Sequence, residues 1–88
     1  MPTISMFFGI LIRMYFGDIG VHNTPHFHAV YGEYEAVFDL VGDLIEGEFP
    51  MKQQAFVKAW ALIHEEELRA NWELAVNREP TFKIDPLK

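Results

Sequence analysis

Three short runs in the first half of the chain carry apolar residues in the pattern of β-strands. The runs are Gly9–Phe16, His26–Tyr31 and Tyr34–Leu40, and segments containing glycine separate them. In the first run the even-numbered positions are all apolar, whereas Arg13 stands among the odd-numbered ones. Because alternate side chains of a strand point to opposite faces, this run predicts one buried face and one mixed face.

The second and third runs predict a tight hairpin. Gly32 and Glu33 stand between them, and glycine at the first central position favours a type II′ turn. A two-residue turn sets the register of the whole hairpin. The expected pairs on the apolar face are Tyr31–Tyr34, Ala29–Ala36 and Phe27–Phe38, and those on the mixed face are Val30–Glu35, His28–Val37 and His26–Asp39.

A second turn of the same type is predicted at 41–44, followed by a short strand over 44–49. This register would place Leu40 opposite Ile45 and Asp39 opposite Glu46. Two carboxylates directly across from each other are unfavourable. A looser loop is therefore an equal alternative.

Residues 51–77 predict a helix, because they contain no glycine or proline and are rich in alanine, leucine, glutamate and lysine. Unbroken, 27 residues would extend about 40 Å. A domain of this size has a diameter of only about 30 Å. The helix must therefore overhang, break near 64–67, or pack against a second chain.

Together these elements predict a single α+β domain over residues 1–88. Its sheet is a three- or four-stranded antiparallel meander, packed on one face by a long C-terminal helix. The apolar hairpin face should meet Phe56, Trp60 and Ile63 of that helix. An overhanging arm would expose a patch that favours self-association, formed by Leu68, Trp72, Leu74 and Val76.

Composition narrows the classes of function. The formal net charge is −6, with only seven scattered basic residues, which argues against direct nucleic-acid binding. No apolar run reaches the length of about 18–20 residues needed to cross a bilayer, and no basic leader region is present. Cysteine is absent, which excludes disulfides and thiolate metal ligands. We expect a cytoplasmic protein without a membrane partner.

Three of the four histidines lie close together, at His22, His26 and His28. His26 and His28 share a strand face, which is a common way to offer a divalent metal two nitrogen ligands. His22 could reach back as a third ligand, and Asp39 faces His26 as a carboxylate partner. Two alternatives stay open: acid–base chemistry by the same histidines, or structural hydrogen bonds to Asp39 and Tyr15. No other cofactor is indicated.

Several stretches resemble the small bacterial family known as domain of unknown function 4160. They are Met1-Pro-Thr-Ile-Ser-x-Phe-Phe-Gly-Ile, Pro25-His-Phe-His, Tyr31-Gly-Glu-Tyr-Glu-Ala and Asn71-Trp-Glu-Leu-Ala. Thr24 stands where members typically have the first of two prolines. The resemblance implies no activity and no functional residues. Members often occur beside another small family, domain of unknown function 2442, which suggests a paired or toxin–antitoxin-like module.

Two hypotheses on function follow. The first is an interaction module that acts as a dimer or with a small protein partner, based on the predicted overhang and apolar arm. The second is a metal-binding protein or small hydrolase that uses His22, His26 and His28. A toxin ribonuclease is a third possibility, against which the acidic balance argues. Whether the protein is an enzyme is left open between these hypotheses.

Overall fold

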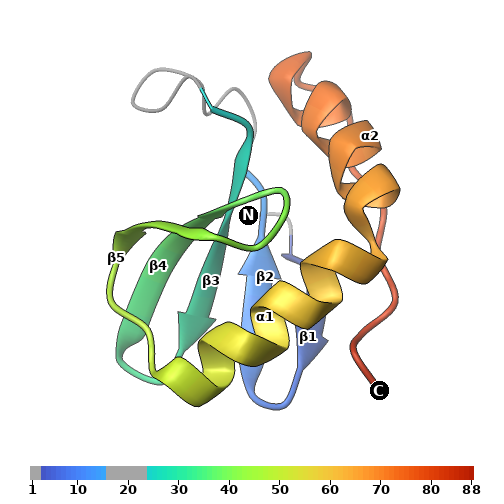
Figure 1. Cartoon of the computed structure of the whole chain (residues 1–88). Coiled ribbons are helices and arrows are strands. Elements are labelled where there is room, and N and C mark those ends of the chain that lie inside the picture. Colours follow the sequence, from blue (N-terminus) through green and yellow to red (C-terminus); the bar gives the residue numbers. More distant parts are fainter. Residues whose placement is uncertain (1–2, 16–23) are drawn as a thin grey trace.

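A five-stranded antiparallel sheet forms the centre of the molecule (Figure 1). The structure is a computed structural model and describes residues 3–15 and 24–88. The strands follow the chain order across the sheet and are β1 (Thr3–Phe7), β2 (Ile10–Arg13), β3 (His26–Tyr31), β4 (Tyr34–Asp39) and β5 (Leu44–Gly47). Two helices follow, α1 (Met51–Ile63) and α2 (Glu65–Val76). The predicted α+β class is confirmed.

The predicted central hairpin is confirmed in full. All six pairs between β3 and β4 occur in the expected register, from Tyr31 opposite Tyr34 to His26 opposite Asp39. Gly32 has a φ of 58°, which the first central residue of a type II′ turn requires. The local turn and the apolar alternation therefore suffice to define this part of the sheet.

The predicted number of three or four strands is wrong, because β1 was missed. β1 joins β2 through a two-residue turn in which Phe8 and Gly9 have φ values of 49° and 79°. Two positive φ angles are typical of a type I′ turn, which usually contains asparagine or aspartate before glycine. A phenylalanine in that conformation is uncommon, so the sequence carries no turn signal there.

The predicted tight turn at 41–44 is wrong, and the looser loop is found instead. The Asp39 carboxylate accepts hydrogen bonds from the backbone N–H groups of Val41 (3.1 Å) and Asp43 (2.9 Å). A bulge at Ile45 in β5 then sets Val37 opposite Glu46 and Phe38 opposite Leu44. This register avoids the unfavourable pairing of two carboxylates.

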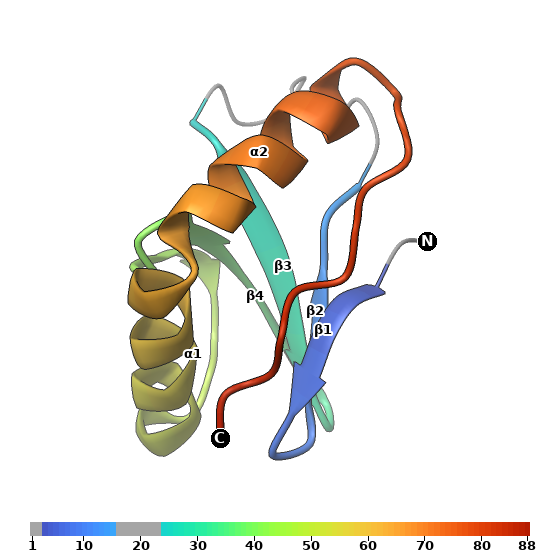
Figure 2. The same ribbon diagram turned by 90° about the vertical axis from the view of Figure 1, so that its right-hand side faces the viewer.

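The long helix predicted over 51–77 is broken at His64, one of the alternatives left open. The N–H of His64 still donates to Trp60 (3.0 Å), and its carbonyl accepts from Leu68 (2.9 Å). The second helix leaves at an angle (Figure 2). The predicted overhang is therefore wrong: the molecule measures 33 × 26 × 20 Å, and Leu68 is fully buried.

Trp60 of α1 lies at the centre of the core. Its ring contacts Phe27 at a centroid distance of 5.7 Å and Phe7 at 5.3 Å, and its Nε1–H donates to the carbonyl of Asp85 (2.8 Å). The predicted contact of Trp60 with the apolar hairpin face is confirmed. The same prediction for Ile63 is wrong, because this side chain is 66% exposed.

The C-terminal segment 77–88 returns past β1 (Figure 2). Asn71 of α2 is fully buried and holds this segment by two hydrogen bonds to the backbone of Phe82. The N–H of Ile84 donates to the carbonyl of Ile4 in β1 (2.7 Å), and the Ile84 side chain is buried. The tail therefore covers the edge of β1 and ties it to both helices.

Candidate functional site

Two of the three candidate histidine ligands lie side by side at the start of β3. The rings of His26 and His28 have a centroid distance of 5.5 Å. His26 is only 1% exposed, packs on Trp72 of α2 (5.0 Å), and has its Nδ1 2.8 Å from the carbonyl oxygen of Thr24. Since a carbonyl only accepts, Nδ1 carries the proton, and in the neutral ring the lone pair is on Nε2.

His28 has a more polar surrounding. Its ring contacts Tyr15 edge to face at 4.5 Å, and its Nδ1 lies 3.9 Å from a carboxylate oxygen of Glu35. Arg13 of β2 is directly opposite His28, so these side chains share one face of the sheet. The predicted mixed face is therefore present, with Arg13 in β2, Tyr15 just beyond the end of β2, and His28 in β3.

The metal prediction depends on His22, which lies outside the described residues. Among residues 3–15 and 24–88, no group of three histidine, aspartate or glutamate side chains could hold a metal ion. Within that part of the chain, the Asp39 carboxylate has its hydrogen bonds with the 39–43 loop. A site with His22, His26 and His28 thus remains a prediction.

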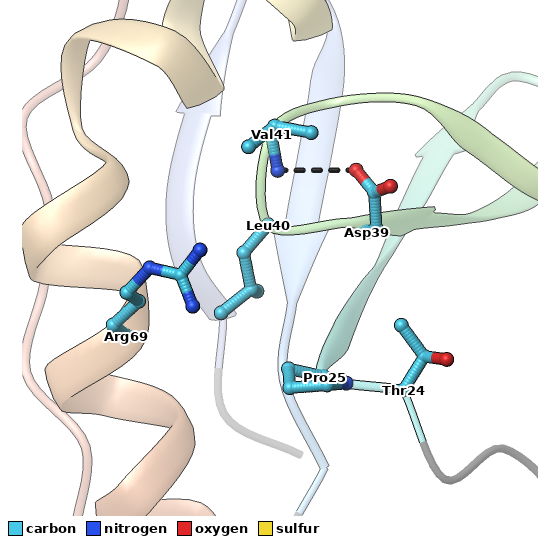
Figure 3. Close-up of a pocket in the computed structure, with 6 residues that line it drawn as sticks. All are labelled: Thr24, Pro25, Asp39, Leu40, Val41 and Arg69. Carbon is cyan, nitrogen blue, oxygen red and sulfur yellow. Dashed lines mark hydrogen bonds between the residues drawn. The ribbon is translucent and has the colours of Figure 1, made fainter.

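A shallow hollow of about 170 Å³ lies between the start of β3, the 39–43 loop and α2 (Figure 3). It is lined by Thr24, Pro25, Asp39, Leu40, Val41 and Arg69. Both charged groups at its wall have other partners: Asp39 holds the loop, and the Arg69 guanidinium binds Glu65 through Nε (3.1 Å) and Nη2 (2.8 Å). The hollow therefore offers a ligand no uncommitted charge.

The outer face of α1 has a different character. Met51 is 83% exposed, Ile63 66% and Leu62 53%. At 100° per residue, the exposed positions of this helix fall within about 120° of its circumference. They are Met51, Lys52, Ala55, Ala59, Leu62 and Ile63, and we call them the α1 surface.

The α1 surface is unusual because five of its six side chains are apolar. A helix on the surface of a globular protein normally turns charged residues to water, and one that is apolar all round is normally covered. Contiguous exposed apolar side chains mark interaction sites. The sequence predicts an interaction patch on the C-terminal arm instead. The signal was present, since apolar residues occur on every side of 51–63.

The expected apolar patch on the arm does not form as predicted. Leu68 is fully buried, and Trp72, Leu74 and Val76 are half-buried. His64 occupies the junction of the helices, with its Nδ1 2.6 Å from Glu67 and its ring against Trp60. No helix in the described ranges is long and apolar enough to cross a bilayer.

Fold and surface together define a small α+β domain, a five-stranded meander covered by a broken pair of helices. The chain belongs to the family described as domain of unknown function (DUF4160), whose sequence model matches residues 9–73. The resemblance inferred from the motifs is thereby confirmed. Comparison with curated proteins and with solved structures found no match.

Proposed function

We propose that this protein is an interaction module that packs the α1 surface against a helix of a protein partner. The observation that carries the proposal is the run of exposed apolar side chains along α1. Ala55 and Ala59 lie in its middle, with larger side chains at both ends. Small central residues let a second helix axis approach closely, and the larger ones enclose it.

Photo-crosslinking in cells tests this function. A photoreactive phenylalanine analogue replaces Leu62 on the α1 surface or, as a matched control, Ile45, an exposed apolar residue of β5. We expect a protein adduct from position 62 that disappears when Ile63→Glu is added. Equal adducts from both positions, or none from position 62, would refute the proposal.

A divalent-metal site is the second candidate. The hydrogen bond from His26 Nδ1 to Thr24 supports it, because metal-ligating histidines commonly donate their other N–H to a carbonyl oxygen. The site would need His22 as third ligand. Titration with zinc, nickel and manganese, followed by the histidine ring signals in NMR, tests it. Joint shifts of all three histidines at a 1:1 ratio would support the site, and unchanged signals would remove it.

A further inference from the structure

We infer that the partner of the α1 surface is a second copy of this chain, packed antiparallel about a two-fold axis near Ala59. The inference rests on the proposed function and names its partner. It comes from charged residues at the two ends of the α1 surface, whose arrangement is self-complementary.

Most charges near α1 have a partner within the chain. Lys58 binds Asp43 (2.7 Å), and Glu65 binds Arg69 (2.8 Å). Glu67 contacts His64 (2.6 Å). In each of these pairs both charged groups have a partner within the chain, so none of them needs a partner from another molecule.

Two exposed charges differ from these. Lys52 lies in the first turn of α1, and Glu66 lies just beyond its end, in the first turn of α2. Within residues 3–15 and 24–88, neither has an ion pair or hydrogen bond of its side chain. The α1 surface therefore ends in an uncommitted positive charge on one side and an uncommitted negative charge on the other.

An antiparallel second copy satisfies both charges at once. Glu66 lines one hollow with Leu62 and Ile63 at the end of α1, and Lys52 lies in the first turn of that helix. A two-fold axis near the middle of the α1 surface therefore brings the lysine end of each copy to the glutamate end of the other. The same axis sets Ala55 against Ile63, a small side chain against a large one. A parallel arrangement would instead bring like charges together, which costs free energy.

The charge distribution of the whole chain also favours a contact between two copies along α1. The net charge of −6 makes two copies repel each other over most of their surface. The helix α1 contains two lysines and no acidic residue, so repulsion is weakest along it. One helix of about 20 Å gives a contact at the small end of the usual range, and we expect a micromolar dissociation constant.

Charge reversal in the purified full-length chain tests the pairing. In sedimentation equilibrium, Lys52→Glu and Glu66→Lys should each weaken dimerisation about tenfold, because each creates two like-charge contacts by symmetry. An equimolar mixture of the two variants should form a heterodimer about as tight as the wild-type dimer, since one pair is then the wild-type Lys52–Glu66 pair and the other is restored with reversed sign. Glu79→Lys, at an exposed position beyond α2, is the charge-matched control and should leave association unchanged within about twofold.

The outcomes separate this inference from the proposed function. A wild-type chain that stays monomeric at high micromolar concentration, or a mixture no tighter than its components, would overturn the two-fold pairing. If the crosslink from position 62 then still joins the chain to a protein of another mass, the interaction module survives with a different partner. If position 62 gives no adduct, both proposals are refuted.

Discussion

The two helices occupy the stretch that the sequence predicts as one helix, yet their exposed faces differ in polarity. The exposed positions of α1 are mostly apolar, with Met51 and Ile63 the most exposed. The first turn of α2 carries three glutamates, and Arg69 binds one of them across one helical turn. Such pairs and charges are what a solvated helix normally shows.

The inner faces of the helices are alike, since each places fully buried side chains in the core. Trp60 anchors α1, and Asn71 with Leu68 anchors α2. Core packing therefore explains the inner face of both helices but the outer face of neither. Core packing does not account for the apolar exterior of α1, which is the observation behind the proposed binding role.

The largest expected effect is on the inner face of α1. Trp60→Ala should lower the free energy of unfolding by about 3–5 kcal/mol, because it leaves a cavity at the centre of the core. Trp60→Phe keeps much of the ring and removes the hydrogen bond to Asp85, so it should cost clearly less. Urea unfolding followed by circular dichroism measures both variants. A loss below 1 kcal/mol for the alanine variant would contradict the core assignment.

A substitution on the inner face of α2 should lower the free energy of unfolding less than Trp60→Ala does, and its effect should be confined to fewer residues. Asn71→Ala removes both hydrogen bonds to Phe82 and should cost about 1–3 kcal/mol. Amide exchange should then accelerate at Ile84 in the tail more than at Val57 in α1. The exposed Asn77→Ala is the matched control, with an expected change within about 0.5 kcal/mol. Equal acceleration at both amides would show that Asn71 does not act through the tail.

Substitutions on the outer faces of the two helices should differ in their effect on association, but not in their effect on the free energy of unfolding. Leu62→Glu on α1 and Ala70→Glu on α2 both lie at exposed positions, so each should change the free energy of unfolding by about 0.5 kcal/mol or less. Only Leu62→Glu should abolish dimerisation in sedimentation equilibrium. Loss of the dimer with both variants would remove the distinction between the two helices.

The smallest effect is expected at the surface pair of α2. Arg69→Ala breaks the contact with Glu65, which is exposed, and should cost about 0.3–0.5 kcal/mol. The difference should shrink further at high salt, where surface charges are screened. Thermal unfolding at low and high salt measures it. A loss above 1.5 kcal/mol would mean that Arg69 supports the neighbouring hollow in a way that its contacts do not show.

The features of the fold that the sequence predicts correctly are those defined by residues close together in the chain. The hairpin through Gly32 was predicted residue by residue, because turn type and alternation both act over a few neighbours. The turn through Phe8 was missed because the tertiary contacts of its neighbours, such as Phe7 on Trp60, stabilise an uncommon conformation. At the candidate site, the shared face of His26 and His28 was predictable, whereas the contact with Trp72 was not.

The sequence by itself determined the α+β class, the central register, the family and the region of the helix break. These depend on alternation, turn residues and helix length, which neighbouring residues define. Only the tertiary structure decided which apolar residues are buried. It buried Leu68, because α2 takes a new direction after the break at His64 and packs on the core, and it left Ile63 exposed, because this residue lies on the outer face of α1. The direction of a helix after a break depends on what it can pack against, and that information is spread over the whole chain.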